Sequence, residues 1–355
     1  MSRFFVYIIV FFCILLVMAG GMAYLIAVAI QRGRHRVRPK VGPFALVTLL
    51  AMALMLIAIA YGYYWGRWEL DKTEIDLSYD TLPASFDGYT IVHISDFHLS
   101  SFYGHEDQLG RVIDSINAAK PDLICFTGDL VSLDTAEVAP LVPWLRRLQA
   151  KDGIVSVLGN HDFLPYGRQA PDLDSIAAVM TRLERDLLGW TVLNNDHIDI
   201  VRGEDTVSVC GCMNQSDDWF RFFHSDQHPP LRKGDLAKAV TGAANFKILL
   251  THDPSQWHHE VMESQREDIP LTLAGHTHCG QLRFGSWTPA SWFFYEVHGL
   301  YTPQSTIHNS RNGAQSTIHY PQSTLYINQG LGCTAPIRIF VPMEITVLHL
   351  SAGTL

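Results

Sequence analysis

The chain has 355 residues, enough for about two average domains or for one large α/β domain. Hydrophobic residues make up 48% of it, which is ample for a large core. The formal net charge is −9, but residues 1–66 contain six Lys or Arg and no Asp or Glu, so the remainder carries −9 − 6 = −15. Such an acidic remainder argues against a nucleic-acid partner, because binding to a phosphate backbone depends on basic patches.

Two uncharged apolar segments, residues 4–30 and 44–65, predict two transmembrane helices. Each exceeds the ~20 residues that a helix needs to cross a bilayer, and a soluble core helix seldom stays uncharged on every face. A cleaved signal peptide is the alternative for the first segment, but its apolar run exceeds the ~7–15 residues usual in such peptides. We therefore expect residues 1–66 to be a multi-pass anchor in the cell membrane, with the lipid bilayer as partner.

The ten residues 31–40 between these helices contain five basic residues, namely Arg32, Arg34, Arg36, Arg38 and Lys40. Basic loops of membrane proteins lie in the cytoplasm. Both helix ends away from the loop would then lie on the other side of the membrane, so the soluble domain is expected to be extracytoplasmic. The alternative is that the loop binds anionic lipid headgroups while the domain is cytoplasmic.

Residues 67–88 carry alternating acids and are predicted to be a linker. Strand-like and helix-like segments alternate from Tyr89 onward, with helices expected at 106–119 and 137–149. This alternation predicts an α/β domain over residues 89–350, with a parallel sheet and helices on its faces. The expected strands are residues 89–95, 123–127, 154–158, 207–210, 246–250, 271–274 and 344–350.

Five short motifs supply potential metal ligands, and each follows or ends a strand-like run. They are Ser-Asp-Phe-His at 95–98, Gly-Asp-Leu at 128–130, Gly-Asn-His-Asp at 159–162, Thr-His-Asp-Pro at 251–254 and Gly-His-Thr-His at 275–278. Ligands gather at the carboxyl ends of parallel strands, and the glycines let backbone approach a metal without a Cβ clash. Carboxylate, amide and imidazole ligands together suit Mn, Fe or Zn rather than calcium. The motifs are weak singly, but together they predict a metal centre.

These motifs resemble those of the calcineurin-like metallophosphoesterases, and the resemblance covers about residues 89–350. The leading apolar segments and the Asn-Gln-Gly-Leu-Gly run at 328–332 are similar to a membrane-associated bacterial branch of that family. Some members of the branch are linked to hydrolysis of the lipid A precursor UDP-2,3-diacylglucosamine. The resemblance implies a β-sandwich flanked by helices (αββα) that binds two divalent metal ions.

The resemblance also implies a role for each matching residue. One metal ion would be bound by Asp96, His98, Asp129 and His278, and the other by Asp129, Asn160, His252 and His276. His161 is assigned to no metal, and would contact the phosphate and protonate the leaving oxygen. Asp162 is expected to orient His161 or a neighbouring loop. The implied enzyme hydrolyses a phosphodiester or pyrophosphate bond, with a lipid-linked substrate such as UDP-2,3-diacylglucosamine in lipid A synthesis.

Three alternative functions remain. An extracytoplasmic phosphodiesterase acting on envelope polymers or lipid headgroups fits the charge rule better, because nucleotide sugars are made in the cytoplasm. A non-catalytic metal-binding scaffold would be favoured by loss of Asn160 or His161, and both are present. A nuclease is disfavoured by the acidic domain and the membrane anchor.

Several other residues receive a structural interpretation. The aromatic runs at 217–223 and 292–295 are expected to pack in the core, with contact to the bilayer or to an acyl chain as the alternative. His93 and Cys125 are expected to be packed inside the domain, and His258-His259 to be solvated on a helix. His308 and His319, in a repeated Gln-Ser-Thr-Ile-His, are expected to be exposed. Cys279 and Cys333 could meet, which the sequence does not decide.

Overall fold

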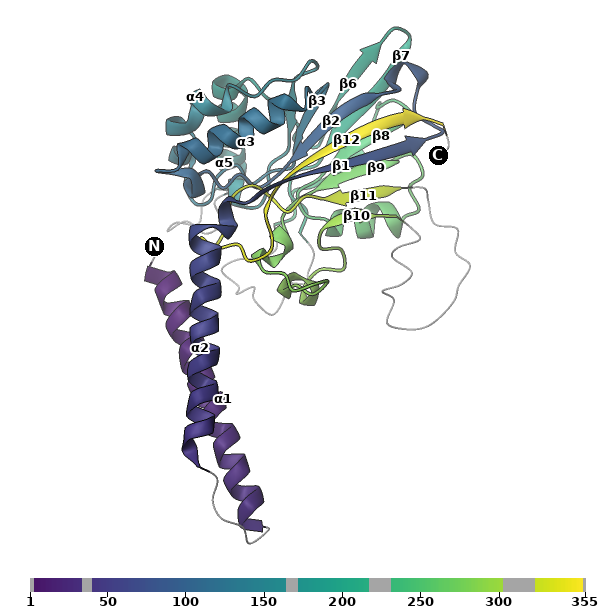
Figure 1. The fold of residues 1–355 in the computed structure, drawn as a ribbon. Helices are drawn as coiled ribbons and strands as arrows, with labels where there is room; N and C mark the ends of the chain where they lie inside the picture. The colour runs from purple at the N-terminus through teal and green to yellow at the C-terminus, as the bar shows by residue number, and fades with distance from the viewer. Residues whose placement is uncertain (1–2, 34–39, 164–171, 217–230, 303–322, 354–355) are drawn as a thin grey trace.

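The computed structural model describes residues 3–33, 40–163, 172–216, 231–302 and 323–353. Two long helices, α1 (Arg3–Gly33) and α2 (Val41–Tyr64), lie side by side and project from one side of a two-sheet domain (Figure 1). Residues Cys13–Arg32 and Val41–Trp68 are long and apolar enough to span a membrane, and neither is buried inside the protein. This confirms the two apolar helices, and their exposure excludes core helices of a soluble domain.

The segment after α2 belongs to the domain. Gly66–Trp68 forms a single 3-10 turn, and β1 (Leu70–Tyr79) pairs in parallel with β12 (Met343–Ala352) over all of its residues. The prediction of a linker over residues 67–88 is wrong for this strand. Its alternating acids arise because β1 lies at the edge of its sheet and turns every second side chain toward solvent.

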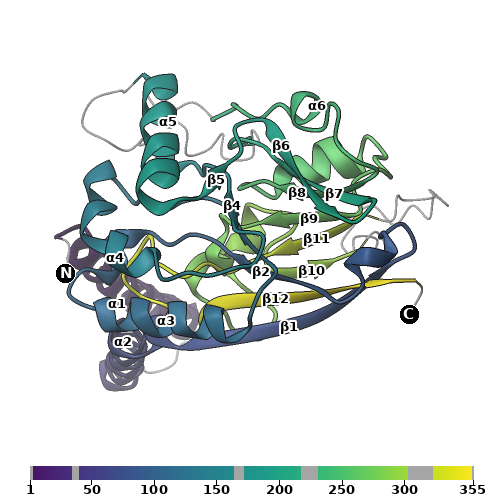
Figure 2. The same ribbon diagram turned by 90° about the horizontal axis from the view of Figure 1, so that it is seen from above.

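The first sheet has the strand order β1-β12-β2-β3-β4-β5. Neighbours from β2 to β5 run parallel, whereas β12 runs antiparallel to β2. Three helices pack against one face of this sheet (Figure 2). The elements are β2 (Tyr89–Ile94), α3 (Glu106–Ala118), β3 (Leu123–Phe126), α4 (Val142–Leu145), β4 (Ile154–Ser156), α5 (Leu173–Arg182) and β5 (Thr191–Val192).

The helix expected at residues 137–149 is only partly formed. Thr135–Glu137 and Ala139–Leu141 are 3-10 turns, and the α-helical part, α4, has four residues. Pro140 and Pro143 account for the difference, because proline lacks the N–H that a continuous helix requires.

The second sheet has the strand order β10-β11-β9-β8-β7-β6. Its four central strands run parallel, and the two edge strands, β10 and β6, run antiparallel to their neighbours. The elements are β6 (Asp196–Arg202), β7 (Asp205–Gly211), α6 (Leu236–Ala239), β8 (Phe246–Leu250), β9 (Leu271–Ala274), β10 (Gly299–Tyr301) and β11 (Thr324–Ile327). Leu236 of α6 and Trp257 of the π-helical turn η9 (Trp257–Met262) pack on its outer face.

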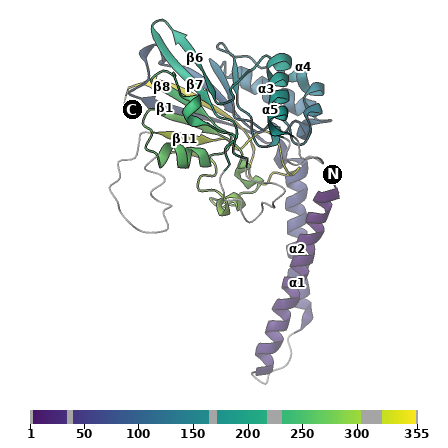
Figure 3. The same ribbon diagram turned by 180° about the vertical axis from the view of Figure 1, so that it is seen from behind.

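The two sheets pack face to face around a shared apolar core. Ile91 and Val155 of the first sheet belong to the same buried cluster as Val209, Ile248 and Leu273 of the second. This αββα sandwich confirms the expected fold class. Figures 1 and 3 show that the helical pair extends from one end of the sandwich, seen from opposite sides.

Several sequence predictions fall outside the described residues. They concern the whole aromatic run at 217–223, both histidines of the repeated pentapeptide (His308 and His319) and three arginines of the basic loop (Arg34, Arg36 and Arg38).

Candidate metal centre

The loops that follow β2, β3, β4, β8 and β9 meet at one end of the sandwich, where they bring the predicted site residues together. Three groups of potential ligands have their ligand atoms within 4.8 Å of one another. These groups are Asp96, His98 and His278; His98, Asp129 and His161; and Asp129, His252 and His276. Asn160 joins them through His252. The segments are up to about 180 residues apart in sequence, as for His98 and His278.

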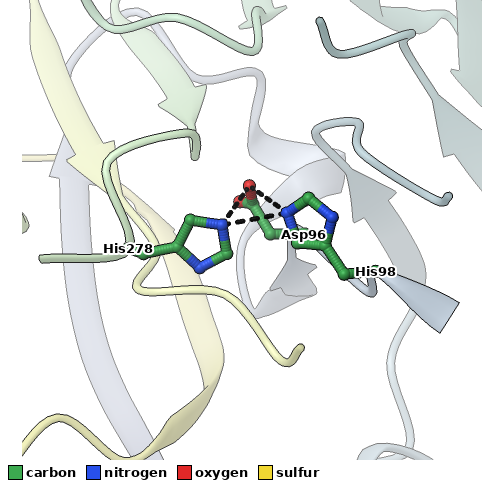
Figure 4. Close-up of side chains that lie close together, drawn as sticks. All are labelled: Asp96, His98 and His278. Carbon is green, nitrogen blue, oxygen red and sulfur yellow. Dashed lines mark hydrogen bonds and ion pairs between the residues drawn. The ribbon is translucent and has the colours of Figure 1, made fainter. Parts of the chain in front are cut away.

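The first cluster joins Asp96, His98 and His278 (Figure 4). Asp96 Oδ1 lies 3.2 Å from His278 Nε2 and 3.9 Å from His98 Nε2, and the two Nε2 atoms are 3.0 Å apart. Two ligands at right angles and ~2.1 Å from one ion would be about 3.0 Å apart, close to the observed separation. Asp96 Oδ1 is buried without a hydrogen-bond partner, so its lone pairs need a cation. The cluster therefore fits a divalent metal.

The second cluster is built around Asp129 and His252. His252 Nε2 lies 3.2 Å from Asp129 Oδ2 and 3.0 Å from Asn160 Oδ1, and His276 Nδ1 lies 3.1 Å from the same nitrogen. His252 Nδ1 is 2.7 Å from the carbonyl oxygen of Thr127, which fixes the proton on Nδ1 and turns Nε2 toward the cluster. Asp129 Oδ2 is also 3.6 Å from His98 Nε2, so this one oxygen lies between the two clusters.

The backbone turns sharply at these residues. Five of the candidate ligands adopt positive φ, a region that residues other than glycine rarely occupy and that costs about 1–3 kcal/mol each. Each of these residues lies within four residues of the end of a strand. Strain of this kind persists where the surrounding structure over-determines it, as at functional sites. The φ values are 52° at Asp96, 40° at His98, 59° at Asp129, 72° at His276 and 48° at His278.

Two glycines allow this crowding. A Cβ at Gly159 would collide with Asp129 Oδ1, and a Cβ at Gly275 would lie 2.5 Å from Asp96 Oδ2. The expected role of these glycines, to bring backbone close to the ligands, agrees with the geometry.

Opposite charges and burial compete in the centre. Burial raises the pKa of Asp96, but His278, His252 and His98 outweigh it and hold this pKa well below its usual value. Burial likewise opposes ionisation of Asp129, and His252 and His161 again lower its pKa. Burial lowers the pKa of His252, but the negative charges of Asp129 and Asp96 raise this pKa to about 10. Without a metal ion, the surrounding protein groups thus keep the carboxylates of Asp96 and Asp129 charged and His252 protonated. A metal ion that binds His252 would have to displace this proton.

Asp162 holds two of the motif loops in place. Its buried carboxylate accepts backbone N–H bonds from Asp129 (2.8 Å), Leu130 (2.9 Å), Val131 (3.2 Å) and Gly159 (2.9 Å). Burial and the charge of Asp129 raise the pKa of Asp162 to about 7, and the N–H donors oppose that rise. These contacts agree with the expected orienting role of Asp162. The loop that Asp162 orients is the one that carries Asp129.

His161 lies beside the ligand atoms of His98 and Asp129. Its Nδ1 donates to the carbonyl oxygen of Ser132 at 2.7 Å, and its backbone N–H donates to Asp129 Oδ1 at 2.8 Å. The ring meets that of His98 edge-on, with centroids 4.8 Å apart. Because a carbonyl can only accept, Nδ1 carries a proton and Nε2 is the nitrogen that can exchange one.

Three positioning residues were missed by sequence reasoning. Asp253 Oδ2 lies 3.7 Å from His276 Nε2, and its place in Thr-His-Asp-Pro could have indicated it. Gln281 accepts from Thr334 and Ala335 and donates to Ile337, so it fixes that loop. Arg338, fully buried, donates to the carbonyl oxygens of residues 329 and 330 and lies 3.5 Å from His278 Nδ1. No local pattern marks Arg338, because its partners are backbone carbonyls.

A pocket of about 430 Å³ opens over the centre. One part of its wall is polar and the other is apolar. The polar part contains Asp129, Asn160, His161, His276 and His278, and the apolar part contains Leu282, Pro289, Ala290, Phe293, Phe294, Ile337 and Ile339. A polar phosphate group and an attached hydrocarbon could both be accommodated.

The remaining sequence predictions have mixed outcomes. His93 and Cys125 are buried as expected, and His93 Nε2 lies 3.0 Å from Thr127 Oγ1. Cys279 and Cys333 are both free thiols.

The expectation of a solvated His258 is wrong, because its ring stacks on Tyr295 and its Nδ1 lies 3.1 Å from Glu296 Oε1. The expected core packing at 292–295 is also wrong for Trp292, which is 68% exposed.

Comparisons with known proteins identify related sequences. The profile of the calcineurin-like phosphoesterase family matches residues 89–280. The uncharacterized metallophosphoesterase YkuE of Bacillus subtilis is 29% identical over 315 residues, covering 85% of this chain and 94% of the relative. A Danio rerio transmembrane protein with metallophosphoesterase domain is 26% identical over 66% of this chain, which spans 50% of that protein. The UDP-2,3-diacylglucosamine pyrophosphatase LpxG of Chlamydia trachomatis is 26% identical over 76% of this chain and 86% of its own length.

Proposed function

Because this chain belongs to the calcineurin-like phosphoesterase family, we propose that it is a membrane-anchored hydrolase that cleaves a phosphodiester or pyrophosphate bond with two divalent metal ions. The carboxylate of Asp129 carries this proposal. Its Oδ2 lies 3.6 Å from a nitrogen of one ligand cluster and 3.2 Å from a nitrogen of the other. A carboxylate shared by two sets of ligands can hold two cations close enough to act on one phosphoryl group.

In this proposal Asp96, His98 and His278 hold one ion, and Asn160, His252 and His276 hold the other, with Asp129 between them. Two bound cations would supply Lewis acidity to the phosphoryl oxygens and activate water near neutral pH. Asp162 keeps the Asp129 loop in position through its four N–H contacts. His161 donates a proton to the leaving oxygen through Nε2, because Nδ1 is engaged by Ser132.

Two observations support a lipid-linked substrate. The pocket joins the ligand cluster to an apolar wall, and two helices suited to a membrane precede the domain directly. UDP-2,3-diacylglucosamine is the leading candidate, since it combines a pyrophosphate with acyl chains and is the substrate named for the Chlamydia relative. The proposed place of the enzyme is then in lipid A synthesis.

A substrate panel on the detergent-solubilised full chain tests this proposal. With added Mn²⁺ we expect hydrolysis of UDP-2,3-diacylglucosamine and of bis(p-nitrophenyl) phosphate, measured as released UMP and p-nitrophenol. Exhaustive chelation should remove both activities, because no cation would then stabilise the negative charge on the phosphoryl oxygens. Added Mn²⁺ should restore both activities. Full activity of the chelated protein would contradict the two-metal proposal, and turnover of the simple diester alone would remove the lipid A substrate.

The basic loop favours a second candidate. Five positive charges at residues 31–40 favour a domain outside the cytoplasm by the positive-inside rule. An extracytoplasmic phosphodiesterase acting on lipid headgroups or envelope polymers would use the same centre. Alkaline phosphatase fused after Leu355 should be active if the domain is extracytoplasmic, because this reporter needs an oxidising compartment. An inactive fusion, together with a fluorescent fusion that is bright, would instead favour the nucleotide-linked substrate.

A further inference from the structure

A row of exposed aromatic side chains lies on the domain near its junction with α2. We call Phe284, Trp287, Trp292 and Phe340 the aromatic ridge. Ring centroids along it are 5.9 Å apart for Phe340–Phe284, 6.5 Å for Phe284–Trp287 and 5.5 Å for Trp287–Trp292. Trp292 is 68% exposed, and Phe284 and Phe340 are each 54% exposed. Contiguous exposed apolar surface of this kind marks an interaction site rather than an ordinary surface.

The ridge continues directly into the end of the second apolar helix. The ring of Phe340 lies 5.8 Å from that of Tyr61, in the last turn of α2. Tyr64 and Trp65, which follow in the chain, are also largely exposed. Tyrosine and tryptophan are typical of the membrane–water interface at the ends of spanning helices. The ridge therefore lies at the level where the bilayer interface would meet α2.

The views of the whole molecule support this placement. In Figures 1 and 3 the green segment that includes η11 (Pro289–Trp292) lies on the side of the domain that faces the helical pair. In Figure 1, α4 lies on the side of the domain that faces away from the helical pair.

The ridge is fixed relative to α2. The backbone N–H of Arg338 donates to the carbonyl oxygen of Gly62 at 3.2 Å, and a Cβ at Gly62 would lie 2.8 Å from Ile339 Cγ1. Phe340 follows with φ at 57°, a conformation that is strained for a bulky residue. The fold thus holds a strained phenylalanine in an exposed position beside the helix, where burial in protein cannot explain it.

The same segments form the apolar wall of the pocket. Leu282, Phe293 and Ile339 line the pocket, and each is next to, or one residue removed from, a residue of the ridge. The wall that faces the metal ligands and the ridge that faces outward are therefore two sides of one layer.

We propose that the aromatic ridge inserts into the interfacial layer of the lipid bilayer, so that the pocket opens toward lipid headgroups. The proposal rests on the membrane anchor of the proposed function. It adds a second contact with the membrane, which the domain itself makes. The occupant of the ridge is the bilayer itself: Trp and Phe side chains partition into the headgroup and upper acyl region, where indole N–H groups stay solvated.

Fluorescence quenching in lipid nanodiscs tests the insertion. The full chain is reconstituted in phosphatidylcholine with or without bromine atoms near the top of the acyl chain, and the emission of Trp292 is obtained as wild type minus Trp292→Phe. Bromine quenches on contact, so we expect at least about a twofold loss of this difference emission in brominated lipid. The conservative replacement keeps an apolar ring and should leave folding intact.

Trp144→Phe is the matched control, because Trp144 belongs to α4, which lies on the side of the domain facing away from the helical pair in Figure 1. Its difference emission should be unchanged by bromine. Equal emission of Trp292 in both lipids would overturn the insertion, whatever the catalytic result. Hydrolysis of bis(p-nitrophenyl) phosphate in the same nanodiscs reports on the proposed function separately. Quenching of Trp292 without hydrolysis would contradict the proposed enzymatic function but support the membrane contact. If the full chain does not float with lipid vesicles in a density gradient, both the anchor and the insertion are contradicted.

Discussion

Replacement of Asp129 by Asn should reduce kcat/KM for bis(p-nitrophenyl) phosphate by at least about 10³-fold, since several kcal/mol of charge stabilisation depend on the metal pair. The substitution keeps the shape of the side chain but removes the charge that its Oδ2 presents to His98 at 3.6 Å and to His252 at 3.2 Å. Metal content, measured on the purified chain after dialysis, should fall from two Mn²⁺ ions to at most one.

Asp186→Asn provides the matched control, because this exposed aspartate pairs with Arg185 on the surface. It should retain both metals and full activity. Thermal unfolding of the two variants distinguishes loss of the centre from loss of the fold. A folded Asp129→Asn chain that still binds two ions and turns over at the wild-type rate would refute the shared-carboxylate assignment.

Replacement of His161 by Gln should depend on the leaving group of the substrate. With an unactivated phenyl diester we expect kcat to fall by about 10²–10⁴-fold, the usual contribution of a general acid. With a p-nitrophenyl diester the loss should be much smaller, because this leaving group departs without a proton. Metal content should stay at the wild-type level, since Nδ1 of His161 contacts the carbonyl oxygen of Ser132 and the proposal assigns the ions to other residues.

His259→Gln is the companion variant, because His259 lies on η9 beside Glu263 and outside the pocket. It should leave the rates on both diesters unchanged. A uniform loss on both substrates accompanied by loss of metal would show instead that His161 is a ligand, as its inclusion within 4.8 Å of His98 and Asp129 would permit.

The sequence predicted those parts of the domain whose signals are local. Strands β8 and β9 have the expected bounds, because each is a short, mostly apolar run that a motif follows at once. The helix α3 was equally clear, since Leu109, Val112 and Ile116 recur at helical spacing and are all buried. The site residues were visible because ligands must follow the strand ends.

The missed parts depend on distant partners. Strand β1 reads as a polar linker until β12 pairs with it, some 270 residues later. Nothing in the sequence around Arg338 distinguishes it from a surface arginine, yet in the interior it donates to the carbonyl oxygens of residues 329, 330 and 332. The exposure of Trp292 was missed because an aromatic run is usually buried, and the neighbouring sequence does not show that this ring stays at the surface.

The junction between β1 and α2 has a kinetic consequence. Only a single 3-10 turn separates the apolar helix from a strand that is paired over ten residues, and Arg338 bonds back to the helix at Gly62. Given the proposed anchor, the catalytic centre stays at a fixed height above the bilayer. No flexible linker lets the domain move away from the membrane to meet a substrate in solution. Encounter then occurs by lateral diffusion in two dimensions. Turnover of a lipid substrate should follow its mole fraction in the membrane, and adding inert phospholipid should slow the enzyme even when the bulk concentration of substrate is unchanged.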